Sequence, residues 1–196
     1  MRNPNKKSTE TLVLGAILTA FVILLQCLAT YTTFFGPFAT AVGLIPIVIG
    51  AAKCGPKISA WLGFVFGVVV LLTGGGNLFL AFNIPGTLIT VLVKGIACGL
   101  ASGLVFKLLE KKNFYIATVA AAVTCPVVNT GVFLLGCALF FMKSADAIAQ
   151  TLGMAVSGMD LFFALATANF LFELALNLVL NPVVVRILNI QKKNRQ

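Results

Sequence analysis

Long apolar runs, separated by short breaks that carry charges, proline or glycine, make up most of the 196-residue chain. The runs cover residues 11–31, 38–52, 58–73, 86–109, 114–142 and 161–188. A helix needs about 20 apolar residues to cross a bilayer, and most of these runs reach or approach that length. The pattern therefore predicts an all-α integral membrane protein, a six-helix transmembrane bundle that forms a single domain over residues 1–196.

The second and third runs are short, and the second contains residues that interrupt helices. Gly43, Pro46 and Gly50 all lie within residues 38–52. A proline inside a helix removes a backbone hydrogen bond, and within a membrane neighbouring groups must replace it. We therefore expect these two helices to be bent, tilted or partly extended, with neighbours that satisfy the carbonyl group freed by Pro46.

Composition excludes several classes of protein. Apolar residues make up 60% of the chain and charged residues only 10%, whereas soluble domains carry about 25% charged residues. The six runs leave no room for a folded extramembrane domain of ordinary size, so any energy-coupling domain is expected on another chain. The chain contains no histidine, which excludes histidine-ligated metals and Ser-His-Asp catalysis within it. We expect this chain not to be an enzyme.

The five cysteines lie within or at the ends of apolar runs, and they lack the paired spacing of a metal site. We interpret them as small buried hydrophobic residues, so neither a metal nor another cofactor is expected. These residues are Cys27, Cys54, Cys98, Cys125 and Cys137.

Basic residues alternate with uncharged connections along the chain. Residues 32–37 and 74–85 carry no charge, and residues 143–159 carry Lys143 against Asp146. Cytoplasmic loops of membrane proteins are enriched in Lys and Arg, so both termini are predicted to be cytoplasmic. The net charge of +9 then marks a membrane surface, and no nucleic-acid partner is expected. The basic residues of the other connections and of the ends are Arg2, Lys6, Lys7, Lys53, Lys57, Lys107, Lys111, Lys112, Arg186, Lys192, Lys193 and Arg195.

The predicted outer connections are unusual. Residues 74–86 begin with three glycines, continue with an apolar stretch and end at a turn. A mobile lid that closes over a pocket from outside fits this pattern, and the alternative is an ordinary interfacial loop held by Phe79 and Phe82. Residues 143–159 could form a short outer helix and turn.

Two charged residues, Lys94 and Glu173, lie deep within predicted spans, where charges are costly and therefore suggest function. At 1.5 Å per residue, Lys94 lies roughly 12 Å below the outer end of its helix and Glu173 roughly 18 Å below the outer end of the last helix. Thr87 and Thr90 share a helix face with Lys94. Asn169, Glu173, Asn177 and Asn181 follow one another at steps of four along the last predicted helix.

These polar faces should point inward, where Asn129 of the fifth helix could join them. We interpret Lys94, Asn129, Asn169, Glu173 and Thr90 as a substrate-binding site in the outer half of the bundle. Lys94 would suit a carboxylate on the ligand, and the amides would suit amide, hydroxyl or ring-nitrogen groups. In the alternative interpretation, Lys94 and Glu173 pair with each other and the asparagines only hold helices together.

The first helix carries small residues at a four-residue spacing. Ala16 and Ala20 would form a flat strip that another helix can approach closely. An internal helix contact and a contact with a partner protein both fit this strip.

These features together resemble the substrate-binding S component of an energy-coupling factor (ECF) vitamin transporter. The resemblance rests on the Ala-x-x-x-Ala strip and on residues 44–51, 55–57, 63–67 and 125–131 (LIPIVIGA, GPK, GFVFG and CPVVNTG). It extends from about residue 12 to 188. The family implies that a vitamin or related micronutrient binds from outside in a pocket formed mainly by helices 4 to 6, in a bacterial plasma membrane.

The resemblance also implies partners. An S component associates with a membrane T component and two cytoplasmic ATPases, and it is thought to topple in the membrane to release its ligand inside. Ala16 and Ala20 match the family's contact with the T component. Pantothenate or biotin would suit Lys94, whereas Glu173 leaves cationic or amine-bearing ligands open. The rival hypothesis is a self-contained small transporter or channel, homo-oligomeric, with Lys94 and Glu173 along its path; a membrane enzyme is the third.

Overall fold

A computed structural model describes residues 4–31 and 42–193, and these residues contain helices but no strand. The long helices are α1, α3, α5, α6 and α8, with shorter elements between them. In chain order the elements are α1 (Pro4–Tyr31), the 3-10 turn η3 (Val42–Leu44), α2 (Ile45–Cys54), α3 (Pro56–Leu72), α4 (Asn77–Leu80), α5 (Ile84–Leu109), α6 (Phe114–Phe140), the 3-10 turn η4 (Met142–Ser144), α7 (Ala145–Leu152) and α8 (Gly158–Lys193).

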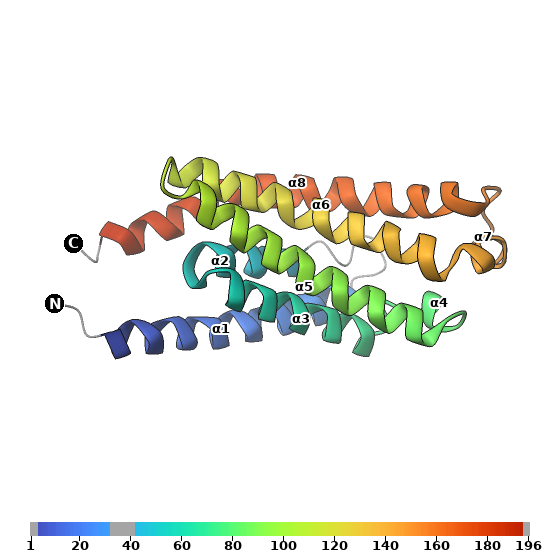
Figure 1. The fold of residues 1–196 in the computed structure, drawn as a ribbon, viewed down its shortest axis with the longest axis horizontal. Helices are drawn as coiled ribbons and strands as arrows, with labels where there is room; N and C mark the ends of the chain where they lie inside the picture. Colours follow the sequence, from blue (N-terminus) through green and yellow to red (C-terminus); the bar gives the residue numbers. More distant parts are fainter. Residues whose placement is uncertain (1–3, 32–41, 194–196) are drawn as a thin grey trace.

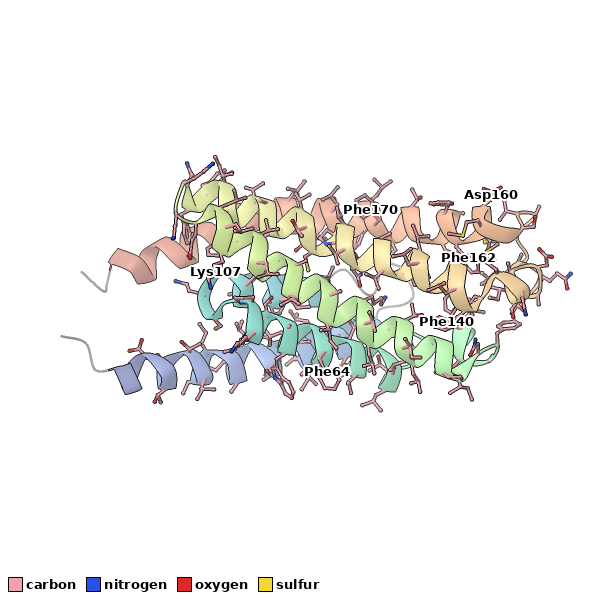
Figure 2. All side chains as sticks on the ribbon, in the orientation of Figure 1. Phe64, Lys107, Phe140, Asp160, Phe162 and Phe170 are labelled. Carbon is pink, nitrogen blue, oxygen red and sulfur yellow. The ribbon has the colours of Figure 1, made fainter. Side chains whose placement is uncertain are left out.

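The helices form an elongated bundle with two distinct ends (Figure 1). Helix α1 begins and helix α8 ends at one end, which we call the terminal end, and the α2–α3 and α5–α6 turns lie toward it. Helices α4 and α7 lie at the opposite end, which we call the α4–α7 end. Lys107 lies toward the terminal end, whereas Asp160 lies at the α4–α7 end (Figure 2).

Four helices are long and apolar enough to cross a membrane. These candidate spans are Thr9–Ala29, Ile84–Leu109, Phe114–Phe140 and Gly158–Val179. Many large apolar side chains project outward from the bundle (Figure 2), and Leu72, Leu108 and Leu139 are at least three-quarters exposed. An apolar outer surface of this kind suits lipid contact.

Helices α2 and α3 are shorter apolar helices of 10 and 17 residues. At 1.5 Å per residue, α2 is only about 15 Å long, half of a typical hydrocarbon core. The expectation that Pro46 frees a carbonyl group for neighbours to satisfy is wrong, because Pro46 lies in the first turn of α2. A proline there frees no carbonyl group, since the first turn has no hydrogen-bonding partners for its N–H groups.

The connections at the α4–α7 end are more ordered than a flexible loop. The segment after the glycines forms the single turn α4, and Gly74 adopts a φ of +86°, a conformation that favours glycine. Asn83 then caps α5, since its Oδ1 accepts from the Gly86 N–H at 3.0 Å and its Nδ2 donates to the Phe140 carbonyl at 3.2 Å. Helix α7 confirms the short helix expected within residues 143–159.

Helices α3 and α5 approach each other at the level of the backbone. A Cβ atom on Gly63 would overlap the Gly95 carbonyl oxygen, and a Cβ atom on Gly95 would overlap the Gly63 carbonyl oxygen. One turn further along α5, a Cβ atom on Gly99 would overlap the Ser59 carbonyl oxygen. Only glycine fits at such contacts, and small residues at this spacing are typical of close helix packing in membranes.

Two hydrophobic cores lie along the bundle. One core gathers residues of α1, α2, α3, α5 and α6, with Leu62 and Phe66 among its fully buried side chains. The other lies at the α4–α7 end and joins α6, α7 and α8, with Phe141 and Phe162 at its centre. Between the helices, near this second core, the bundle leaves a cavity.

Candidate functional site

A cavity of about 290 Å³ lies beneath α4, between α5, α6 and α8. Its wall is mainly apolar, with a small number of polar groups from different helices, a composition typical of small-molecule sites. The polar residues that line it are Lys94 of α5, Asn129 and Thr130 of α6 and Asn169 of α8.

Lys94 places a cation beside an aromatic wall. Its side chain is 8% exposed, and its Nζ atom lies 5.5 Å from the centroid of the Phe133 ring. The face of an aromatic ring attracts a cation at this range, which offsets part of the cost of burying the ammonium group. Phe133 in turn packs edge-to-face against Phe79 of α4 at 5.5 Å between centroids. The ammonium group is therefore held at the cavity by residues of α4 and α6.

Glu173 lies at the centre of an amide network and is fully buried. Asn129 Nδ2 donates to both carboxylate oxygens, at 3.3 Å and 3.2 Å, and Asn169 Nδ2 donates to Oε1 at 2.8 Å. Asn177 Nδ2 donates to the backbone carbonyl of Glu173 at 2.8 Å. Two amides from two helices thus stabilise the carboxylate within the bundle, since buried charges need such partners.

The structure brings together three of the five residues expected at the site. Lys94, Asn129 and Asn169 line the cavity, whereas Glu173 lies behind the two asparagines and does not line it. Thr90 also lies outside the lining, and its buried side chain faces Gly136 of α6.

The sequence did not predict several of the residues that line the cavity. Phe133 follows Asn129 by four residues, so the rule that such residues share a helix face could have identified it. Leu165 and Ala166 precede Asn169 by four and three residues, so the same rule applies to them. Thr130 and Leu152 carry no comparable signal, because their part in the wall depends on how α6, α7 and α8 pack. The side chain of Asn181, the last member of the expected stripe, lies outside the described residues.

A second candidate surface lies on α1. Ala16 and Ala20 are exposed, while the neighbouring Gly15 is buried against Ile58 of α3. The Thr19 hydroxyl donates to the Gly15 carbonyl at 2.8 Å and so stays within the helix. The two alanines therefore lie on the outward side of α1, away from its contact with α3.

A comparison with protein families gives a match over nearly the whole chain. The matching family is described as ECF transporter, substrate-specific component, and it covers residues 10–185. The chain belongs to this family. It is thus the substrate-specific S component of an ECF transporter, a transporter subunit rather than an enzyme, and a multi-pass membrane protein. S components work in general with a T component and ATPases.

Comparisons with curated proteins and with solved structures gave no match. The family assignment thus rests on the family match, and the ligand has to be argued from the cavity itself.

Proposed function

We propose that this S component binds a vitamin or related micronutrient from outside in the cavity at the α4–α7 end, and delivers it inward with a T component and two cytoplasmic ATPases. The observation that carries the proposal is the convergence of Lys94, Asn129 and Asn169 from three helices on one mainly apolar cavity. Convergent polar groups in an apolar wall fix the orientation of a small ligand and give specificity.

The segment around α4 serves as the lid of this site. Phe79 lines the cavity and also packs against Phe133, Phe141 and Phe162. Because Phe79 joins α4 to both α6 and α8, movement of α4 would open or close the cavity without unfolding the bundle. The glycines at 74–76 supply the backbone freedom for such a movement.

The proposed topology has six helices, with α2 and α3 completing the set, and both termini in the cytoplasm of a bacterial cell, as one domain over residues 1–196. The turns near the terminal end, or the helix ends beside them, carry Lys53, Lys57, Lys107 and Lys111, and the positive-inside rule places the cytoplasm on this side. The cavity then opens toward the outside, where a nutrient arrives.

The T component docks on α1 at Ala16 and Ala20 in this proposal. Both alanines are exposed, and their small side chains let a partner helix approach closely. Neither alanine lines the cavity, so binding and docking use different residues.

Copurification tests this proposal. A tagged chain expressed with its native operon partners should bring down a T component and two ATPases, and native mass spectrometry should find a bound vitamin on the isolated chain. ATP-dependent uptake by the assembled complex in liposomes is the second measurement. Uptake by the chain alone, without ATP or partners, would instead identify a self-contained transporter and refute the proposal.

A further inference from the structure

The hydrogen bonds of Glu173 fix the orientation of the Asn129 side chain. A carboxylate accepts hydrogen bonds, and of the two ends of an amide only the NH₂ group can donate them. The Asn129 NH₂ group must therefore face Glu173, as the contacts at 3.3 Å and 3.2 Å require. The amide oxygen then faces away from the carboxylate.

That oxygen is an unsatisfied acceptor. Asn129 is 2% exposed and lines the cavity, and its Oδ1 has no hydrogen-bond partner within the described part of the chain. A buried acceptor without a partner costs free energy, and a donor supplied by a ligand would remove that cost. Because the Asn129 side chain belongs to the cavity wall, a ligand that reaches its amide could supply this donor.

The charge at the cavity has one sign. Lys94 is the charged side chain among the described residues of the wall, because Glu173 lies behind the two asparagines. An anionic ligand group gains a charge-assisted hydrogen bond there, whereas a cationic group would be repelled by the ammonium group.

We infer that Glu173 is a positioning residue that turns the Asn129 oxygen toward the ligand, so that the site selects a small molecule with an N–H or O–H donor close to a carboxylate. This inference rests on the proposed function, because it assigns the ligand class of the same cavity. It disfavours ligands whose only charge is positive, which the sequence leaves open.

A mixture of vitamins tests the ligand class on the unmodified chain. Purified protein in detergent is incubated with equimolar biotin, pantothenate, nicotinate, thiamine and pyridoxine and then analysed by native mass spectrometry. Biotin and pantothenate carry both a carboxylate and donors, so retention of one of them is expected. Nicotinate has a carboxylate but no donor, and the other two lack a carboxylate. Retention of any of these three overturns the inference while leaving the proposed function intact. Retention of none of the five rejects the inferred ligand class, whereas the copurification and uptake measurements decide the proposed function.

A double-mutant cycle tests the positioning role, with the retained vitamin as titrant. Asn129→Leu and Glu173→Gln should each weaken binding about 2- to 13-fold, the value of one neutral hydrogen bond. Because Glu173 acts through Asn129, the double variant should be no weaker than the weaker-binding single variant. Effects that multiply would mean that Glu173 contacts the ligand independently, and they overturn the positioning role.

Asn177→Leu is the matched control, since the Asn177 amide donates to the backbone carbonyl of Glu173 and the residue does not line the cavity. Its affinity should match that of the unmodified chain. Thermal unfolding in detergent is measured for every variant, so that a loss of folding is not read as a loss of binding. If a variant does not fold, the ligand-class experiment still decides the inference.

Discussion

Replacement of Lys94 by methionine removes the charge at the cavity while keeping an unbranched apolar side chain. In the structure the ammonium group lies 5.5 Å from the Phe133 ring and the side chain is 8% exposed, so water screens it little. A hydrogen bond to a charged group is worth about 1.5–3 kcal/mol in stability. At about 1.4 kcal/mol per factor of ten, Lys94→Met should lower ligand affinity roughly 10- to 150-fold.

Isothermal titration of the purified chain in detergent measures this change. Lys107→Met is the matched control, because Lys107 lies on the same helix but is exposed and lies toward the terminal end. Its affinity should stay within about twofold of the unmodified chain, since exposed charges far from a site contribute little. Unchanged affinity in Lys94→Met would refute the reasoning. If Lys94→Met fails to fold and only the additional change Glu173→Gln restores folding, Lys94 and Glu173 form a structural pair instead.

Three other predictions test the fold, the docking surface and the topology. Gly63→Ala should lower the free energy of unfolding by about 1–3 kcal/mol in detergent, because the added methyl group overlaps the backbone of α5. The control Gly131→Ala, whose methyl group meets open space, should leave stability unchanged or slightly raised, and equal effects of the two substitutions would contradict the close contact. Ala16→Trp should preserve ligand affinity but strongly reduce ATP-dependent uptake by the complex, and normal uptake would remove this face of α1 as the docking surface. In a cysteine-free background, an impermeant thiol reagent added outside whole cells should label Gly75→Cys but not Lys111→Cys, and the reverse pattern would overturn the topology.

The sequence predicted the family and the helical membrane architecture, because both depend on features that are local in the chain. Apolar runs and their breaks define most helices to within a few residues, as for residues 86–109 against Ile84–Leu109 in the structure. The predicted boundaries differ most from the structure for the second run, residues 38–52. A run of apolar residues does not reveal where its helix begins, and α2 begins only at Ile45, so that Pro46 lies in the first turn.

The lining of the cavity could be predicted in part for a similar reason. A charge or amide within an apolar span carries its own signal, which located Lys94, Asn129 and Asn169. Spacing along a helix cannot tell which of several polar residues reaches a cavity and which lies behind it. Glu173 was therefore grouped with the ligand contacts, although the structure places two asparagines between the carboxylate and the cavity.

The backbone contact between α3 and α5 has a consequence for how this protein could change its ligand during evolution. Gly95 follows Lys94 directly in the chain, so the position of the lysine is fixed by a contact that tolerates no side chain. Substitutions at this contact between α3 and α5 would disturb the packing of the bundle. Helices α6 and α8, in contrast, contribute to the wall through side chains such as Phe133, Leu165 and Asn169. New ligand preferences are thus expected to arise on α6 and α8, while α3 and α5 retain their glycines.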